Sequence, residues 1–425
     1  MSEDASRPSI RRAAGWALAD QSLSSLMTLV FGIAVASSVS ADAFGAFGLA
    51  LAAYWILLGL NRAVSADPLS IRFAARPAPE LREAARDAAG ASLVVGLLGG
   101  AVLCAAAPAV DEMQSALLPL GLAMPVLLVQ DCLRYVAFSE GRGHVAFASD
   151  AVWALLTVGG IVALNVSGPT STAAFLTVWT SAAAIAAVVS MTALSTLPRP
   201  SHAIDWARAH VDLVPRLTAE TMLVNGAGHV SLYLVGAVAG LAAAGSLRGA
   251  VMLMGPLNVV LIGTSLYGTP EGARLAARST ELLARFARLI AAVLAMASIA
   301  WTGLLLIVPD RLGELLLGAS WNGARDVVLQ TGLSMAAVGL TAGAIVGLRA
   351  RAAARRSLRV GIVMAPLNLI AAVAGAAATG AEGAATGIAL ATSTGTVVAW
   401  RELRAELRAE TSIETLQTGA PHGVA

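Results

Sequence analysis

Apolar runs long enough to cross a membrane recur along the whole chain, and they constrain its fold more than any motif does. A spanning helix needs roughly 20 apolar residues. Only 13% of the residues are charged, against about 25% in soluble domains. The chain is therefore predicted to be an all-α polytopic membrane protein. The twelve predicted transmembrane helices cover residues 14–39, 44–66, 88–110, 115–138, 145–166, 171–197, 217–239, 246–267, 286–308, 327–348, 358–378 and 380–400.

Arginine is concentrated in every second connection between these helices, and this pattern predicts how the chain crosses the membrane. All 28 basic residues are arginine. They fill both ends of the chain and the connections that follow even-numbered helices. The opposite connections are predicted to hold only Arg248, Arg311 and Arg325. Because positive charge stays on the cytoplasmic side, both termini are expected there. The opposite connections carry acids instead: Asp42, Asp111, Glu112, Asp310, Glu314 and Glu382.

A long basic connection at residues 198–216 divides the chain into six plus six helices. An N-terminal lobe at 1–200, a C-terminal lobe at 201–400 and a cytoplasmic tail at 401–425 are predicted. Because each half has an even number of helices, repeated halves would be parallel repeats related by an axis along the membrane normal. In support, the second and eighth helices are closed by Asp67-Pro68 and Thr269-Pro270.

Three stretches of sequence resemble the bacterial polysaccharide and O-antigen flippases. They are FGAFGLALA with NRAVSADPLSIR at residues 44–72, LLLGASWNGARDVV at 315–328, and GLRARAAARRSLRVG at 347–361. These flippases belong to the superfamily that also contains the MATE drug exporters and the lipid II flippases. The resemblance implies two six-helix bundles related by pseudo-two-fold symmetry, as in MATE proteins, around a central cavity that works by alternating access.

The same resemblance implies a location and a cargo. The location is the cytoplasmic (inner) membrane of a bacterium, and the cargo is a lipid-linked oligosaccharide or polysaccharide precursor on undecaprenyl pyrophosphate. The implied partners are this lipid-linked glycan, membrane lipids, and a glycan polymerase or glycosyltransferases. No substrate residue of the family can be matched to this chain one for one.

Motifs for enzymatic chemistry are missing from the sequence. There is no metal-ligand spacing, no nucleophile motif and no phosphate-binding glycine loop. We expect no enzyme activity, no cofactor, no metal and no nucleic-acid partner. Cys104 and Cys132 lie in apolar runs and are predicted to be buried free thiols.

Ionisable residues inside apolar runs are costly, so they are functional candidates. A first group, Asn61, Arg62, Arg134, Asp20 and Asp131, is predicted near the cytoplasmic ends of its helices. Arg62 is expected to meet Asp20 or Asp131. Arginine binds phosphate bidentately, so this group predicts a vestibule for a pyrophosphate, with the acids holding the arginines in the empty state. The alternative is a structural ion-pair network or snorkelling side chains.

A second group lies near mid-membrane in the predicted C-terminal lobe. Asn225, His229 and Asn258 are candidates for binding sugar hydroxyls, and Glu220 with His229 for coupling a proton. Pro256 and Pro366, in the eighth and eleventh helices, are predicted to interrupt them. The alternative is interhelical hydrogen bonding that only packs the helices, as also expected of Asn368.

Four functions remain open at this point. The leading one is a lipid-linked oligosaccharide flippase, because the predicted mouth is basic. A MATE-like exporter of small molecules, coupled to protons or sodium, is the alternative. A major facilitator transporter is disfavoured because the connection at residues 67–87 is long and lacks the G-D-R-x-G-R pattern. The fourth is a scaffold for glycan assembly that transports nothing.

Overall fold

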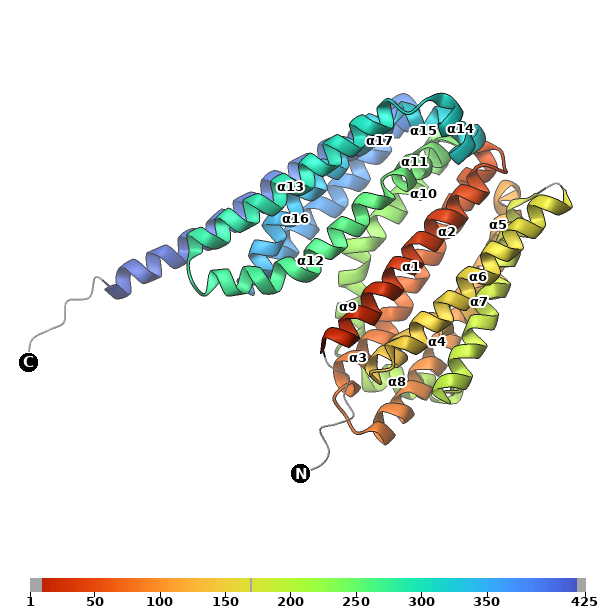
Figure 1. Ribbon diagram of the computed structural model, residues 1–425, viewed down its shortest axis with the longest axis horizontal. Helices are drawn as coiled ribbons and strands as arrows, with labels where there is room; N and C mark the ends of the chain where they lie inside the picture. Colours follow the sequence, from red (N-terminus) through yellow and green to blue (C-terminus); the bar gives the residue numbers. More distant parts are fainter. Residues whose placement is uncertain (1–9, 169, 419–425) are drawn as a thin grey trace, which may run out of the picture. The chain divides into compact units, whose positions relative to one another are not determined.

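The computed structural model describes residues 10–168 and 170–418, and Figure 1 shows them as helices joined by short connections. Arg7 of the basic N-terminal tail and the end of the predicted C-terminal tail lie outside the described residues. By contacts, the helices form two compact units. Unit 1 comprises Met1–Gly249 and Asp310–Gly323, and unit 2 comprises Ala250–Pro309 and Ala324–Ala425. The predicted lobe boundary at residue 200 stays a prediction.

Unit 1 contains the first seven predicted spans and the start of the eighth. Its longest helices, α4 and α5, pack along each other, and α5 also packs on α7. Its elements are α1 (Ile10–Ala36), α2 (Ala41–Asn61), η1 (Arg62–Ala66), α3 (Asp67–Phe73), α4 (Ala78–Ala106), η2 (Ala107–Ala109), α5 (Asp111–Ser139), α6 (Gly143–Ser167), α7 (Thr172–Leu194), η3 (Pro200–His202), α8 (Ala203–Ala209), α9 (Val214–Thr221), η4 (Met222–Gly226), α10 (Ala227–Ala239), most of α11 (Leu241–Leu253), α14 (Asp310–Leu317) and η5 (Gly318–Ser320).

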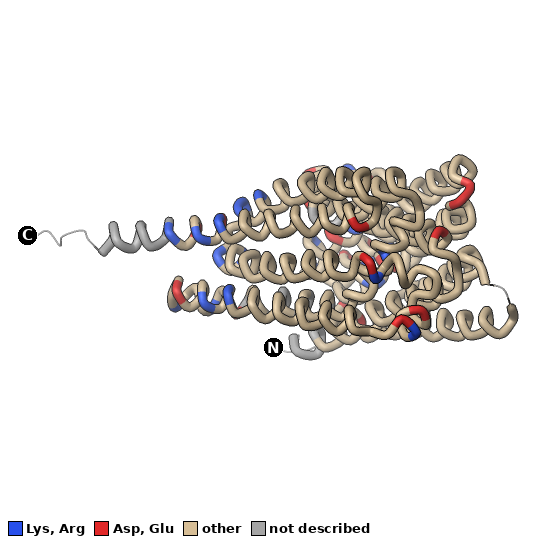
Figure 2. The backbone as a smooth tube through the Cα atoms, turned by 90° about the horizontal axis from the view of Figure 1, so that it is seen from above, with Lys and Arg blue, Asp and Glu red and all other residues tan. Residues whose placement is uncertain are grey.

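Unit 2 is built on α13, α16 and α17, which lie side by side in Figure 1. Figure 2 shows basic residues gathered at the ends of helices in this unit. Near that end, Arg356 forms ion pairs with Glu402 and Glu406 at 2.9 and 2.6 Å. Its elements are α12 (Gly255–Ala276), α13 (Thr280–Leu306), part of α15 (Trp321–Asp326), α16 (Val328–Ala350) and α17 (Ala354–Thr418).

The predicted fold class, an all-α polytopic membrane protein, is confirmed. Among the described residues, nine helical stretches are long and apolar enough to span a membrane. One of them, in α17, joins two predicted helices across a kink at Thr379 and Gly380. The seventh and eighth predicted spans are broken into shorter helices, α9–η4–α10 and α11–α12.

The second span does not stop at Pro68, contrary to the prediction. The helix continues from Ala41 to Phe73, with a π-helical turn at η1. Proline lacks the N–H that would bond to the carbonyl four residues earlier, which here belongs to Val64. The indole Nε1 of Trp206 donates to that carbonyl at 2.9 Å instead. A side chain from α8 therefore satisfies the backbone group that the proline leaves free.

Two further expectations about helix ends are wrong. Helix α17 continues through Pro366 and bends only at Thr379 and Gly380, where glycine permits a positive φ of 64°. The eighth span begins at Leu241 rather than at 246, because Gly240, at φ 88°, makes the turn from α10. Arg248 consequently lies inside α11 and not in a connection. The break at Pro256 is confirmed, since α12 begins at Gly255.

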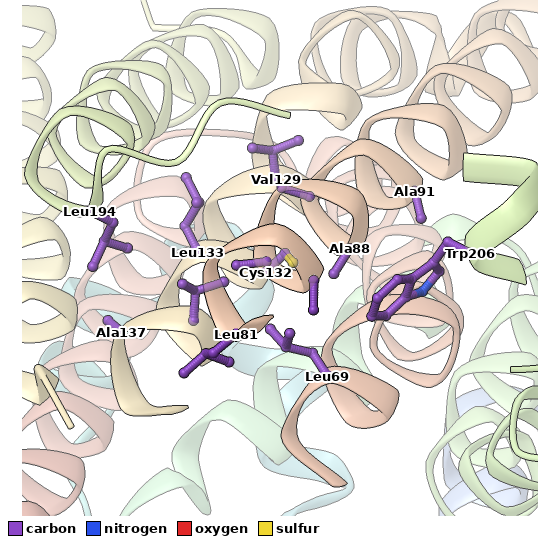
Figure 3. Close-up of a cluster of buried hydrophobic side chains, with 14 of the residues drawn as sticks. Leu69, Leu81, Ala88, Ala91, Val129, Cys132, Leu133, Ala137, Leu194 and Trp206 are labelled. Carbon is purple, nitrogen blue, oxygen red and sulfur yellow. The ribbon is translucent and has the colours of Figure 1, made fainter. Parts of the chain in front are cut away.

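The connection between α7 and α9 is docked on the basic end of unit 1, the end where α3 meets α4. Figure 3 shows Trp206 beside Leu69 and Ala88 in a buried cluster. His210 is 2% exposed, and its Nδ1 donates to the Trp206 carbonyl at 2.8 Å. Burial lowers the pKa of the His210 imidazole, and the positive charge of Arg72 lowers it further. The docked connection therefore holds a neutral histidine.

A short strap, Asp310–Gly323, belongs to unit 1 although its neighbours in sequence on both sides belong to unit 2. The indole of Trp321 covers Gly313, where a Cβ would overlap the ring, and donates to Asp310 at 2.9 Å. Gly318 packs against the carbonyl of Ala36 at the end of α1. The strap is thus a folded element that covers the end of α1.

Candidate transport site

A small cavity of about 70 Å³ lies within unit 1 among α1, α2, α5, α6 and α7. We call it the N-terminal cavity. One side is charged and the other is aromatic. Its lining residues are Ser24, Met27, Thr28, Phe31, Leu51, Tyr54, Trp55, Leu58, Arg62, Gln130, Asp131, Arg134, Asp150, Trp153 and Trp179.

Arg62 and Asp131 form a bidentate ion pair in this cavity. Nε and Nη2 of Arg62 donate to the two carboxylate oxygens at 2.9 and 2.6 Å. Arg62 is the first residue of the π-helical turn η1. The guanidinium of Arg62 also lies over the ring of Tyr135, 5.4 Å from its centroid. The sequence left Asp20 and Asp131 open as partners of Arg62, and the structure pairs Arg62 with Asp131.

Arg134 bridges two other carboxylates, Asp20 and Asp150. Its Nε donates to Asp20 at 2.6 Å, and Asp150 lies 3.5 Å away. Gln130 donates to the other oxygen of Asp150 at 2.9 Å. The Oδ1 atom of Asp20 is buried and has no hydrogen-bond partner. A single guanidinium thus holds two buried acids, one of them incompletely satisfied.

The charges in this cluster do not balance. Three carboxylates, Asp20, Asp131 and Asp150, are paired with two guanidiniums. The side chains of Asp20, Asp131 and Asp150 are 1%, 6% and 6% exposed. Water therefore screens their charge poorly, and one negative charge remains uncompensated. Carboxylates that share a site in this way do not all ionise readily, so the cluster is suited to binding a proton.

The aromatic side of the cavity is held rigidly. Trp153 donates its indole N–H to the Trp179 carbonyl at 2.9 Å, and the two rings lie 5.1 Å apart. Tyr54 stands perpendicular to Trp179 at 5.5 Å and contacts Trp55. Such a wall offers flat apolar faces next to the charged cluster.

Asn61 is placed differently from the other candidates of its group. It is fully buried and does not line the cavity. Its amide donates to the Leu128 carbonyl at 3.2 Å, and Ser65 donates to its backbone carbonyl at 2.7 Å. Asn61 thus joins α2 to α5.

The second candidate group is divided between the units. Glu220, on α9, and His229, on α10, belong to unit 1, whereas Asn258, on α12, belongs to unit 2. Glu220 is exposed and His229 half-buried. Asn225 lies in η4, and its side chain is outside the described residues. Asn368 accepts a hydrogen bond from Thr392 at 3.2 Å, which joins the two halves of α17.

Sequence reasoning missed Asp150 and the depth of Arg248. Asp150 is an acid inside an apolar run, the same signal that identified Asp131, so it could have been found. In the part of the chain that the structure describes, no cluster of His, Cys, Asp or Glu could hold a metal ion.

Comparisons with known proteins support the fold. No protein-family model and no curated protein sequence matches the chain. An inward-facing MATE multidrug-resistance transporter of the MOP superfamily is similar in structure with a TM-score of 0.71, 15% identity, and coverage of 92% of this chain and 96% of that one. A MOP superfamily transporter from Pyrococcus furiosus gives a TM-score of 0.61 with 12% identity and coverage of 94% and 95%. An outward-facing MATE transporter gives 0.58 with 14% identity and coverage of 95% and 96%. The chain is therefore a multi-pass membrane protein with the fold of the MATE transporters.

Proposed function

We propose that this chain is a membrane exporter that works by alternating access and is driven by protons, with Asp20, Arg134 and Asp150 as its coupling site. One observation carries the proposal. Two buried carboxylates share one guanidinium, and an oxygen of Asp20 lacks a partner. A proton bound between Asp20 and Asp150 neutralises the cluster and turns an unsatisfied acceptor into a hydrogen-bond donor.

Proton binding couples to conformation through this charge. The deprotonated cluster carries a net negative charge, which is stable only where water reaches the cavity. The protonated cluster is neutral and tolerates a closed, dry cavity. A ligand shifts a conformational equilibrium by its difference in affinity for the two states, and here the proton is that ligand. The arginine pattern supports an orientation with both termini in the cytoplasm, and the resemblance to bacterial flippases implies the inner membrane.

The test measures proton binding without knowledge of the cargo. Trp153 and Trp179 line the same cavity as Asp150, so the part of the tryptophan emission of the purified chain that these two residues contribute reports its protonation. We expect a pH-dependent transition in the natural protein that Asp150→Asn abolishes and Asp20→Asn shifts. Asp111→Asn, at an exposed acid that begins α5, is the matched control and should leave the transition unchanged. An unchanged transition in both cavity variants contradicts the coupling site.

A second candidate function is the flipping of a lipid-linked oligosaccharide. The aromatic wall favours it, because Trp and Tyr rings stack on the apolar faces of sugars. Both cavity arginines are already paired with carboxylates, so a pyrophosphate would have to displace an acid to bind them. Glycosyltransferases and a glycan polymerase are the partners that this function requires.

Deletion of the gene followed by lipid extraction separates the two functions. A flippase predicts accumulation of a lipid-linked saccharide, reversed by the natural chain and reversed less well by Trp55→Leu. Normal levels of the lipid-linked saccharide would contradict the flippase function, and the proton-driven exporter of small molecules would remain as the proposal.

A further inference from the structure

A groove of about 380 Å³ lies at the basic end of unit 1, between the start of α4 and the docked connection that contains α8. We call it the acidic groove. Helices α4 and α8 pack against each other there (Figure 1). The groove lies beyond the apolar part of α4, whose predicted span begins at residue 88. Its volume is within the range of sites for small molecules, roughly 300–1,000 Å³.

One face of α4 supplies the groove with three carboxylates. Glu80, Glu83 and Asp87 follow one another at intervals of three and four residues, which places them on one side of the helix. All three line the groove. Asp205 of α8 lines it from the other side and lies 3.8 Å from Arg208, beyond hydrogen-bond distance. Acids therefore face the groove from both elements that form it.

The carboxylates of α4 keep free oxygens. Arg199 lies 4.0 Å from Glu83 and 3.9 Å from Asp87, so it forms no hydrogen bond with either. The Oδ1 atom of Asp87 is buried and has no hydrogen-bond partner. The nearby Nδ1 of His202, at 3.3 Å, does not have the geometry of a hydrogen bond to it. A buried acceptor on the wall of the groove is thus left without a donor.

A buried histidine is an independent sign of a ligand. His210 lines the groove and is 2% exposed. Its Nδ1 bonds to the Trp206 carbonyl, which can only accept, so the neutral ring carries its proton on Nδ1 and Nε2 is an acceptor. Among the described residues, nothing donates to Nε2. The rings of Trp206 and Phe73 lie 4.1 and 6.0 Å from the imidazole, and together they give the groove an aromatic floor.

We propose that the acidic groove binds a guanidinium compound. The carboxylates and Nε2 of His210 accept hydrogen bonds, whereas a guanidinium has five donors and no acceptor. Its flat face also stacks on aromatic rings. The row from Glu80 to Asp87 extends on the order of 10 Å at roughly 1.5 Å per residue, which leaves room for a second cationic group. Agmatine, a guanidinium and an ammonium joined by four carbons, has this form.

A ligand in the acidic groove would bridge α4 and α8. It would therefore hold the connection between α7 and α9 in its docked position, where Trp206 bonds to the Val64 carbonyl. The groove shares no residue with the N-terminal cavity. The proposals for the groove and for the coupling site can consequently fail independently.

The test is isothermal titration calorimetry of the purified full chain in a neutral detergent. The probes are agmatine, N-carbamoylputrescine, in which an uncharged urea replaces the guanidinium, and the tripeptide alanyl-arginyl-alanine with blocked ends. Agmatine should bind at least about 10-fold more tightly than N-carbamoylputrescine, the effect of losing a hydrogen bond from a charged group. Equal binding of these two overturns the proposal. Tighter binding of agmatine than of the tripeptide identifies a free compound as the source of the guanidinium, and the reverse order identifies an arginine of a partner protein.

Two variants and a control locate the site. Asp87→Asn should weaken agmatine binding about 10-fold or more, because its side chain is only 25% exposed. Glu83→Gln should weaken it about 3-fold, since this side chain is 74% exposed and water screens its charge. Glu112→Gln, at an exposed acid in the first turn of α5, is the control and should bind normally. Unchanged binding in both groove variants places the ligand elsewhere and overturns the proposal.

Hydrogen exchange gives a second readout that does not depend on a variant. Agmatine should raise the protection of α8 in the natural chain, because the ligand joins α8 to α4. Glu83→Gln changes an exposed side chain and should fold like the natural chain, so a smaller rise in this variant reports lost binding rather than misfolding. Binding of agmatine without added protection of α8 overturns the proposal.

Discussion

The pair of Arg62 and Asp131 predicts a coupling free energy that a double-mutant cycle can measure. Two charge-assisted hydrogen bonds of 2.9 and 2.6 Å join them. A hydrogen bond to a charged group contributes about 1.5–3 kcal/mol. Asp131 is 6% exposed but Arg62 is 31% exposed, so solvent weakens the pair. We expect a coupling free energy of about 2 kcal/mol, within the range found for contacting residues.

The cycle uses Arg62→Gln, Asp131→Asn and the double variant. Arg62→Gln leaves a buried carboxylate unpaired and should lower the free energy of unfolding by about 3 kcal/mol. Asp131→Asn should cost about 2 kcal/mol, because the half-buried arginine can still reach water. The double variant should cost about 3 kcal/mol rather than the sum, since neither partner is left charged.

Unfolding of the purified protein in mixed micelles, titrated with dodecyl sulfate and followed by circular dichroism, provides the free energies. The control cycle uses Arg208 and Asp205, an exposed pair 3.8 Å apart with both side chains 79% exposed. It should show no measurable coupling. Additive effects within about 0.5 kcal/mol at Arg62 and Asp131 would refute the reasoning, because the pair would then be an ordinary surface contact.

Three further predictions concern the packing of unit 1. Trp206→Phe leaves the Val64 carbonyl without its donor and should lower the free energy of unfolding by about 1–2 kcal/mol. Adding Pro68→Ala to this variant restores a backbone N–H and should recover part of the loss in the same unfolding assay. The pKa of His210 is lowered in the docked connection, so protonation favours the undocked form. Hydrogen-exchange protection of α8 should therefore fall as the pH drops below about 6.5. Protection that is independent of pH would contradict a buried neutral histidine. Gly45→Ala places a methyl group against a carbonyl of α11 and should cost about 1–3 kcal/mol, whereas Gly15→Ala, with open space around it, should cost nothing by dodecyl sulfate titration.

The fold class could be predicted because apolar length is a local property. Each run of roughly 20 apolar residues satisfies its own backbone as a helix wherever it packs. The positions of helix ends were less predictable, since they depend on contacts. Pro68 does not end its helix because Trp206, far away in sequence, bonds to the freed carbonyl. The sequence shows a proline but not its compensation.

The charged site was predictable in part for the same reason. Its ionisable residues stand out against apolar surroundings, so Asp131 and Arg134 were identified as candidates. Which acid meets which arginine depends on helix rotation, which periodicity leaves open, so Arg62 had two expected partners. Arg248 was assigned to a connection because the start of its helix was placed five residues too late.

The strap has a consequence for the synthesis of the protein. Unit 1 is made from residues up to Gly249 together with Asp310–Gly323, so the ribosome must translate the segment between them before the unit is complete. At about 5–20 residues per second, the contact of Gly318 with α1 becomes available only on the order of several seconds after α11 has emerged. During that interval the end of α1 is uncovered in the nascent chain. A stop codon before Asp310 should therefore yield an N-terminal fragment that inserts but is degraded faster than one ending after Gly323.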